Sequence, residues 1–446
     1  MSPSTRRELL GTTAGLAATA LAGCIGSPDA GSATDGRSGT ASSTDDAGRG
    51  TEPGAASDSW PQFGADPRNT GTADVVGPGA TDPELAWRYD AGTPTMNASP
   101  VVADGVAYVP GSGDPGLIHA IDIGTGEQRW SFEPAGYATS APALVDGTLY
   151  VGTWGKRFYA IDADTGEERW SREIGHLFGR SSPAVVDGTV YVGTAGDGPS
   201  VACALLALDA ATGETEWQYR EFEGREWIES SPAVGDGRVY VVGGRSLRAV
   251  DAETGEEVWI RDGVVHPNMS PAFVEGRLYY AALDTSGEDP VPEVRALDPA
   301  TGETLWATEI SDPSARTSPA VADGRVYVAA TSRQACSLDW DNDSECTPDA
   351  RGRLYALDAE TGDHEWAVEI EPDTRSAPAV ADGVVYVGCG DGLSAVTVDG
   401  EHAWHVPFEP QDDTLYVMSS PAVADGYAFV GAADGRLRAV RSANQK

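Results

Sequence analysis

The chain has 446 residues, of which 40% are hydrophobic and 22% charged, with 54 Gly and 29 Pro; this is the composition of a globular protein rich in turns. Asp and Glu outnumber Lys and Arg by 69 to 30, which gives a formal net charge of −39, and only Lys156 and Lys446 are lysines. Such a field repels the phosphates of nucleic acids and of anionic lipids, so a nucleic-acid-binding protein and a basic membrane-binding patch are both excluded.

Residues 1–23 have the pattern of an export signal. An arginine pair at 6–7 precedes a 14-residue uncharged stretch at 9–22. That stretch is shorter than the roughly 20 apolar residues that cross a bilayer as a helix. The segment resembles a twin-arginine (Tat) signal peptide ending in a lipoprotein box, so we expect Cys24 to carry a lipid anchor on the outer face of the cytoplasmic membrane. The alternative is a disordered N-terminus that happens to carry these residues.

Residues 24–58 consist almost entirely of Gly, Ser, Thr, Ala and Asp. Such a composition buries too little apolar surface to offset the entropy lost on ordering, so this segment is expected to be a disordered tether. A flexible coil of this length spans roughly 30 to 35 Å on average. The tether would therefore hold the folded domain, expected at 59–446, just off the membrane.

From about residue 84 the sequence repeats itself with a period near 45 residues. One half of the repeat reads SSPAVVDGTVYVGT at 181–194, with an Asp-Gly or Glu-Gly dipeptide between two short apolar runs. Because such dipeptides between β-type runs are strong hairpin signals, each of these segments is expected to form a β-hairpin. Eight prolines mark this half-repeat: Pro100, Pro142, Pro183, Pro232, Pro271, Pro319, Pro378 and Pro421.

The other half of the repeat reads YAIDADTGEERW at 159–170 and predicts a second hairpin with its turn at Thr165-Gly166-Glu167. Two hairpins make a four-stranded sheet, and sheets arranged radially make a propeller. Downstream of the prolines this half is complete in seven units only. We therefore predict an all-β, eight-bladed β-propeller of four-stranded antiparallel blades, in which a strand at 84–89 completes the last blade and closes the ring.

The second half-repeat ends in a tryptophan, and two interpretations of these residues differ in function. They could form a ligand cage, or each could pack as a wedge between neighbouring sheets. One Trp per blade at one strand position is typical of packing, and burying it contributes about 5 kcal/mol as an upper bound. The residues are Trp130, Trp170, Trp217, Trp259, Trp306, Trp366 and Trp404.

The repeat resembles the pyrroloquinoline-quinone (PQQ) type propeller family, whose pattern A-x-D-x-x-T-G-E-x-x-W stands here at 160–170. The resemblance covers residues 60–441 and includes a lead-in at 60–71. Members of this family include quinoprotein alcohol dehydrogenases and the propeller lipoprotein of the Bam outer-membrane assembly complex. In size, anchor and lack of extra domains this chain is similar to the second. Its acidic, lysine-poor composition resembles that of proteins from salt-loving archaea, so a role in barrel insertion does not carry over.

The sequence lacks the functional residues that the resemblance to the dehydrogenases would imply. Those enzymes use an adjacent Cys-Cys disulfide over the cofactor, and no two cysteines adjoin in this sequence. Their calcium-binding Glu and Asn and their catalytic Asp have no matching positions. The sequence also has no haem-attachment motif and no serine or cysteine nucleophile motif. No catalytic residue is predicted, and no cofactor is expected.

Loops that join the outer strand of one blade to the inner strand of the next converge on one mouth of a propeller's channel. Three arginines in this position predict a site for a polar small molecule or a peptide terminus, with guanidinium groups binding an anion. The alternative is that they pair with acids and fill the channel. The candidates before the Ser-Pro and Ala-Pro steps are Asn97, Tyr137, Arg180, Trp227, Glu229, His266, Asn268, Arg316, Arg375 and Tyr416.

The sixth unit carries a 22-residue insertion at 331–352. In an exported protein, Cys336 and Cys346 on one loop are expected to form a disulfide. Four alternating acids between them offer oxygen ligands for Ca²⁺, although the EF-hand pattern fails, and a solvated acidic loop is the alternative. The acids are Asp339, Asp341, Asp343 and Glu345. Cys203 and Cys389 fall in opposite units and are expected to be small core residues.

These features favour an exported, lipid-anchored and monomeric propeller that acts as a binding or scaffold module at the cell surface. Its expected partners are other surface proteins or a small polar ligand. A quinoprotein-type oxidoreductase with a cofactor in the channel is the competing function, and a carbohydrate or peptide sensor is a third. The fold itself does not choose among them, because function resides in sites grafted on a fold.

Overall fold

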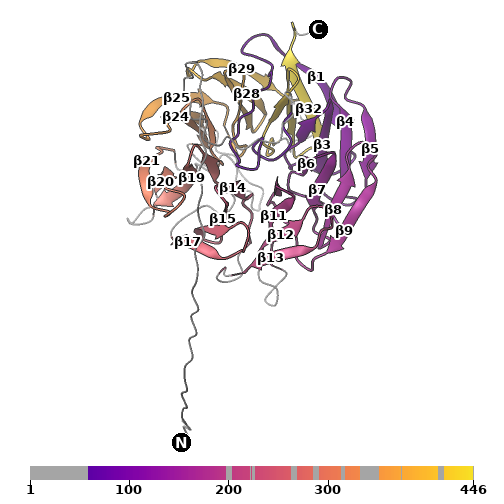
Figure 1. The fold of residues 1–446 in the computed structure, drawn as a ribbon. Coiled ribbons are helices and arrows are strands. Elements are labelled where there is room, and N and C mark those ends of the chain that lie inside the picture. Colours follow the sequence, from indigo (N-terminus) through magenta and orange to yellow (C-terminus); the bar gives the residue numbers. More distant parts are fainter. Residues whose placement is uncertain are drawn as a thin grey trace, which may run out of the picture. The chain divides into compact units, whose positions relative to one another are not determined.

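The computed structural model describes residues 59–196, 203–220, 222, 227–262, 269–284, 291–312, 317–331, 351–372, 374–409 and 416–444. Residue contacts divide the chain into units 1–53 and 54–446, and every described residue belongs to the second. In this unit eight four-stranded antiparallel sheets form a ring, as predicted (Figure 1). The described residues include no helix long and apolar enough to cross a membrane.

Each of the first four blades consists of four strands that follow one another along the chain. Blade 1 contains β2 (Val101–Ala103), β3 (Val106–Gly111), β4 (Leu117–Asp122) and β5 (Gln128–Phe132). Blade 2 contains β6 (Ala143–Val145), β7 (Thr148–Gly152), β8 (Arg157–Asp162) and β9 (Glu168–Glu173). Blade 3 contains β10 (Ala184–Val186), β11 (Thr189–Gly193), β12 (Leu205–Asp209) and β13 (Thr215–Tyr219). Blade 4 contains β14 (Ala233–Gly235), β15 (Arg238–Gly243), β16 (Ser246–Asp251) and β17 (Glu257–Asp262).

The remaining blades follow the same order except for the last one. Blade 5 contains β18 (Ala272–Val274), β19 (Arg277–Asp284), β20 (Val291–Leu297) and β21 (Thr304–Glu309). Blade 6 contains β22 (Ala320–Ala322), β23 (Arg325–Thr331), β24 (Gly352–Asp358) and β25 (His364–Ile370). Blade 7 contains β26 (Ala379–Ala381), β27 (Val384–Cys389), β28 (Gly392–Thr397) and β29 (His402–Pro407). Blade 8 combines β30 (Ala422–Ala424), β31 (Tyr427–Gly431) and β32 (Arg436–Ser442) with β1 (Pro83–Asp90).

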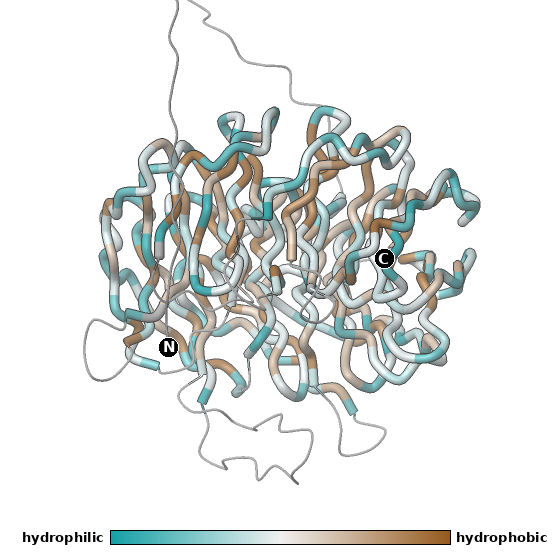
Figure 2. The backbone as a smooth tube through the Cα atoms, turned by 90° about the horizontal axis from the view of Figure 1, so that it is seen from below, coloured by the Kyte–Doolittle hydropathy of each residue, from teal (hydrophilic) through white to brown (hydrophobic). Residues whose placement is uncertain are grey.

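The Asp-Gly and Glu-Gly dipeptides form the turns between the first and second strands of every blade. In blade 3, Asp187 has a φ of 49° and Gly188 a φ of 83°, and the other seven dipeptides also have two positive φ values. Two successive residues in the left-handed region are the signature of a type I′ turn, whose twist matches that of a hairpin. Hydrophobic residues gather in the strands, whereas the turns are hydrophilic (Figure 2). The hairpin prediction is therefore confirmed.

The ring is closed. Each innermost strand contacts the innermost strands of both neighbouring blades, and the series returns from β30 to β2. In blade 8, β1 pairs antiparallel with β32, so that Trp87 lies opposite Ala439 and Tyr89 opposite Leu437. The first strand of the domain thus completes the last blade, as the sequence predicts.

The repeated tryptophans lock each blade to the next. The indole Nε1 of Trp130 donates a hydrogen bond of 2.8 Å to the Ala163 carbonyl of blade 2. Its ring lies over Gly166, where an added Cβ would come within 2.7 Å of the ring. Equivalent bonds to the next unit join Trp87, Trp170, Trp217, Trp259, Trp306, Trp366 and Trp404 to their neighbours. The tryptophans are therefore wedges that pack between the blades.

A segment before the first strand lies along the inside of the ring. We call residues 60–72 the inner segment; its backbone carbonyls and the side chain of Gln62 accept one backbone N–H from each of seven successive innermost strands. The carbonyl of Trp60 accepts from Val102 of blade 1 at 2.9 Å, and that of Gly71 accepts from Val380 of blade 7 at 2.8 Å. Because innermost strands are sheet edges with unpaired N–H groups, the inner segment satisfies groups that would otherwise face the channel.

Cys203 and Cys389 are buried, as expected of core residues. Thr331 ends β23 and Gly352 begins β24, so the two ends of the predicted insertion lie in strands. The predicted disulfide between Cys336 and Cys346 and the acidic loop at 339–345 lie outside the described residues. The predicted anchor, Cys24, also lies outside them.

Candidate functional site

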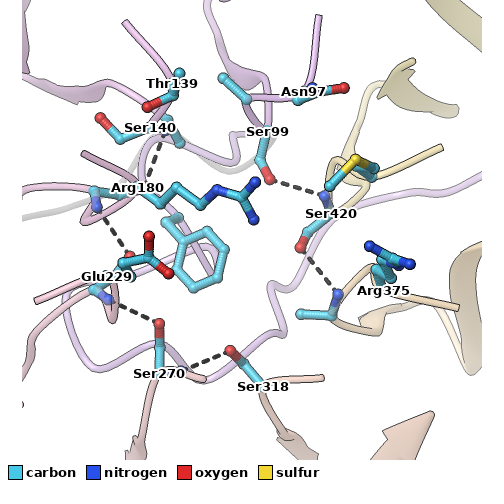
Figure 3. Close-up of a pocket in the computed structure, with 17 residues that line it drawn as sticks. Asn97, Ser99, Thr139, Ser140, Arg180, Glu229, Ser270, Ser318, Arg375 and Ser420 are labelled. Atoms are coloured by element: carbon cyan, nitrogen blue, oxygen red, sulfur yellow. Dashed lines mark hydrogen bonds between the residues drawn. The ribbon is translucent and has the colours of Figure 1, made fainter. Parts of the chain in front are cut away.

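In the described entry segments the chain is extended before the proline of the blade, and alternate residues face the channel. Successive side chains of extended backbone point to opposite sides. The residue directly before each proline lines a pocket at the mouth of the channel, as do the described residues three positions before it and Phe63 of the inner segment (Figure 3). The pocket has a volume of about 210 Å³. The repeat thus places equivalent sequence positions of successive blades around one mouth.

In five blades the side chain two positions before the proline turns into its own blade, whereas Ala98 and Ser140 at this position line the pocket. The Ser181 hydroxyl accepts a hydrogen bond of 2.9 Å from the backbone of Gly193. Ser230, Thr317, Ser376 and Ser419 make the same bond to the residue twelve positions further on. These bonds fix the entry segments to the second strands. The pocket is therefore built on rigid elements.

Serines directly before the prolines form a hydrogen-bonded chain around the mouth. The backbone N–H of Ser182 donates to the Ser231 hydroxyl at 3.0 Å, and that of Ser231 donates to Ser270 at 2.9 Å. Four further backbone N–H groups donate to serine hydroxyls in the same way: Ala141 to Ser182, Ser270 to Ser318, Ala377 to Ser420, and Ser420 to Ser99. Two positions lack the accepting hydroxyl, since Ala141 and Ala377 stand there.

Two cationic side chains face each other across the pocket. Arg180 enters blade 3 and Arg375 enters blade 7, which are four blades apart in the ring of eight and hence on opposite sides. Both line the pocket, and Arg180 is exposed whereas Arg375 is half-buried. In Figure 3 the side chain of Arg180 extends over the pocket from one wall, and Arg375 lies on the other side. The mouth therefore offers guanidinium donors to a ligand.

Glu229 is the single carboxylate among the described residues that line the pocket. Burial raises the pKa of its carboxyl group, and the charge of Arg180 opposes this shift. The two side chains do not come within the 4.0 Å of an ion pair in the described part of the chain. Arg180 thus influences Glu229 through space without being neutralised by it.

Two polar atoms of the pocket have no hydrogen-bond partner. These are Oδ1 of Asn97 and Oγ of Ser140, and both atoms are buried. A buried polar atom without a partner costs about 1 to 3 kcal/mol.

The structure brings four of the predicted site residues together: Asn97, Arg180, Glu229 and Arg375 all line the pocket. Tyr137 and Trp227 lie outside the lining, where each contacts Trp154. Tyr416 also lies outside the lining. His266, Asn268 and Arg316 are not among the described residues.

Several lining residues were missed in the sequence, namely Thr139, Met418, Phe63 and the serines before the prolines. Thr139 and Met418 stand three positions before their prolines, as do Asn97, Arg180, Glu229 and Arg375. Counting back three residues from each proline would have found them. Phe63 carries no such signal, because the inner segment is not part of the repeat.

Metal-ligating side chains do not cluster in the part of the chain that the structure describes: no group of three or more His, Cys, Asp or Glu residues is placed to hold an ion. The predicted calcium ligands, Asp339, Asp341, Asp343 and Glu345, belong to the segment that is not described. The calcium prediction therefore stays a prediction.

Known proteins share both the repeat and the fold. A quinohemoprotein alcohol dehydrogenase from Comamonas testosteroni is 31% identical over 344 residues, which are 70% of this chain and 39% of that protein. The chain thus spans less than half the length of this relative. The crystal structure of that enzyme superposes with a TM-score of 0.67 at 19% identity over 88% of this chain and 82% of that one. BamB from Moraxella catarrhalis superposes with a TM-score of 0.58 at 19% identity, over 80% of this chain and 99% of that one.

A family model described as outer membrane protein assembly factor BamB matches residues 33–243, 197–288, 246–347 and 291–445. The matched segments overlap and cover all eight blades. Because this match extends over most of the sequence, the chain belongs to the family of the outer membrane protein assembly factor BamB.

Proposed function

We propose that this protein is an exported binding and scaffold module, anchored through Cys24 to the outer face of the cytoplasmic membrane, which captures an anionic group at the mouth of its channel. The observation that carries the proposal is the pair of opposed arginines, Arg180 and Arg375, in a pocket of a chain with a net charge of −39. Elsewhere the acidic surface repels anions, so a local pair of guanidinium groups directs an anion to this place.

The exposure of Arg180 favours a ligand over the alternative that the arginines only fill the channel. Arg180 makes no ion pair with Glu229, the one acid that lines the pocket within the described residues. A filling role would place the guanidinium on a carboxylate, because an unpaired charge gains little from closing a channel. The chain of serines adds hydroxyl groups that can donate to a carboxylate or accept from a ligand hydroxyl.

A quinoprotein-type oxidoreductase is the second candidate, and the similarity to quinohemoprotein alcohol dehydrogenase favours it. The pocket does not fit the calcium-bound quinone of such enzymes. Calcium takes six to eight oxygen ligands. The described residues of the lining include one carboxylate, Glu229, and the side chain of Asn97 enters from a blade three steps away. We therefore favour binding over oxidation.

Calorimetric titration of the full chain with succinate and citrate tests the proposal. We expect binding that weakens about tenfold or more in Arg180→Ala and in Arg375→Ala, since a charge-assisted hydrogen bond contributes about 1.5 to 3 kcal/mol. The matched controls are Arg88→Ala and Arg172→Ala, which remove the same charge from exposed positions on outer strands. Equal affinities in all four variants would contradict the proposal.

The oxidoreductase alternative has its own measurement. Reconstitution of the chain with PQQ and Ca²⁺, followed by a dye-reduction assay with alcohols, should give no turnover. Turnover that is lost in Glu229→Gln would overturn the binding proposal in favour of the enzyme.

A further inference from the structure

Three aromatic side chains form a shelf beside the mouth pocket. Trp154 stacks on Tyr137 with ring centroids 5.8 Å apart and an interplanar angle of 24°, and it meets Trp227 edge-on at 5.7 Å and 71°. Trp227 is 42% exposed and is the one aromatic among the large exposed hydrophobic residues of the described chain. We call Tyr137, Trp154 and Trp227 the aromatic shelf.

The aromatic shelf is joined to the pocket through residues of three neighbouring blades. The indole Nε1 of Trp154 donates a hydrogen bond of 3.1 Å to Oγ1 of Thr139, which lines the pocket. The Thr139 hydroxyl donates in turn to the Gly179 carbonyl at 3.0 Å, next to Arg180. Trp227 stands two residues before Glu229 in the same extended segment. The shelf and the Arg180 side of the pocket thus form one continuous wall.

An exposed, rigid aromatic surface next to hydroxyl and guanidinium groups has a definite chemical complement. A pyranose ring presents an apolar C–H face that packs on an aromatic ring, while its hydroxyl groups require hydrogen-bond partners. Aromatic rings bury a large apolar area, and indole combines this with a polar edge. The serine chain and Glu229 supply partners for hydroxyl groups. A carboxylate on the ring matches a guanidinium.

The same wall is poorly suited to an extended peptide. A peptide bound as an additional strand needs free backbone N–H and C=O groups. At the mouth, eight residues stand directly before the prolines. The backbone N–H groups of six of them already donate to the hydroxyl of the serine at the same position in the next blade. The groups presented to a ligand are therefore side chains. A cavity of about 210 Å³ also has room for one sugar ring. The aromatic shelf lies outside this cavity and offers a surface to a second sugar ring.

We propose that the aromatic shelf and the mouth pocket together bind an acidic saccharide, with a pyranose face on Trp227 and its carboxylate at Arg180. This inference rests on the proposed function of the mouth as an anion site and adds the class of ligand. The acidic group explains the arginines, and the sugar ring explains the exposed indole beside them. Neither a simple anion nor a neutral sugar uses both features.

Titration of the full chain with trigalacturonate, the neutral galactotriose and succinate tests the inference. Trigalacturonate should bind about tenfold or more tightly than either other probe, because only it engages both parts of the wall. Trp227→Ala should weaken trigalacturonate about tenfold while succinate changes by less than about twofold. Trp227→Phe should restore most of the lost affinity, and Arg180→Ala should weaken trigalacturonate and succinate alike.

Leu305→Ala is the matched control, because Leu305 is an exposed apolar residue on an outer strand, β21, away from the mouth. Succinate binding that depends on Arg180, without any gain for trigalacturonate and without an effect of Trp227→Ala, would overturn the saccharide inference and leave the anion site standing. Absence of binding by all three probes would overturn both. A peptide with a free C-terminal carboxylate that binds more tightly than trigalacturonate, and that loses affinity in Trp227→Ala, would also overturn the saccharide inference.

Discussion

Single residues at the mouth set its charge through burial and position. Burial raises the pKa of Glu229 although Arg180 opposes the shift, so desolvation outweighs the nearby positive charge. Arg180 itself is exposed and therefore keeps much of its hydration. The result is a pocket in which the carboxylate of Glu229 is protonated more easily than that of an exposed glutamate.

The raised pKa of Glu229 predicts that anion binding strengthens in acid. As pH falls from 7 through this pKa, the carboxylate is protonated and one repulsive charge leaves the pocket, so the affinity for an anion should rise by up to about tenfold. Titration with methanesulfonate, whose charge stays constant between pH 7 and 4, measures this effect. Glu229→Gln should bind the probe more tightly at pH 7 and should lose most of the pH dependence.

Glu173→Gln is the control, because Glu173 is an exposed acid on the outer strand β9. An unchanged pH dependence in Glu229→Gln would show that another group titrates.

His119 predicts an acid sensitivity of the fold. Burial lowers the pKa of His119 to about 4, and its Nδ1 lies 3.1 Å from the Tyr89 hydroxyl, across the joint between blades 8 and 1. The unfolded chain binds a proton on this residue near pH 6.5 whereas the folded chain does not, so the free energy of unfolding should fall as pH falls from about 6.5 to 4. At pH 5 the loss amounts to about 2 kcal/mol.

Urea unfolding of wild type and His119→Leu at pH 7 and 5 measures this contribution. The variant should lose less stability between the two pH values than the wild type loses. His402→Leu, which changes an exposed histidine, should behave as the wild type does. A variant His119→Leu with full acid sensitivity would refute the assignment.

At the scale of the secondary-structure elements, the turn between the third and fourth strands of a blade explains why the repeat contains both a Thr-Gly pair and a Trp. The Gly at the outer turn has a positive φ, 73° at Gly166, and carries no side chain where the indole of the preceding blade lies. The carboxylate of Asp162 accepts from the backbone N–H of Thr165 at 2.9 Å and shapes the same turn. Gly and Trp are therefore two halves of one contact, which the repeat places in neighbouring blades.

Two glycines separate the steric part of this contact from the conformational part. Gly166→Ala adds a methyl group 2.7 Å from the Trp130 ring at a φ of 73°, whereas Gly188→Ala, at a φ of 83°, meets no atom within 4 Å. Gly188→Ala should cost about 1 to 2 kcal/mol for the left-handed backbone. Gly166→Ala should cost about 1 to 3 kcal/mol more, because the ring must move. Equal melting temperatures of the two variants would show that the indole does not require the glycine.

For the whole molecule, closure depends on a joint that the chain does not bridge covalently. β1 and β32 belong to opposite ends of the domain and are held together by their ladder and by side chains at its edges. Arg441 donates to the Glu84 carboxylate through Nε at 2.9 Å, and Trp87 reaches Ile123 of blade 1 at 2.8 Å. Blade 8 therefore fastens the ring twice, within its own sheet and against the next one.

Trp87→Ala tests this joint, and Trp217→Ala at a continuous joint is its control. Removal of a packed indole costs about 3 to 5 kcal/mol, so both variants should be destabilised. Only Trp87→Ala should also lose amide protection in β1 and β32 under native conditions. No hairpin turn connects these two strands, so β1 can separate from β32 while the rest of the blade stays folded. A stable, fully protected Trp87→Ala would show that the indole of Trp87 does not hold β1 in the ring.

The sequence alone determined the number of blades, their hairpins and the strand that closes the ring. Each of these depends on local signals repeated eight times, such as Asp187-Gly188 at a type I′ turn and Trp170 at the end of an outer strand. A repeated local preference needs no knowledge of distant contacts. Four of the predicted mouth residues, including Arg180 and Arg375, line the pocket for the same reason, because their place follows from the blade order.

Only the tertiary structure decided what fills the channel and which side chains face it. The inner segment is not repeated, and backbone N–H groups of seven blades hold it. Backbone donors place little constraint on the residue types of the segment that they bind, so its sequence does not reveal its position. Tyr137 and Trp227 stand five positions before a proline and Glu229 three, a distinction that depends on how far each entry segment runs along the channel wall. Contacts between residues far apart in sequence determine that geometry, so the aromatic shelf and the mouth pocket form only when the ring is closed.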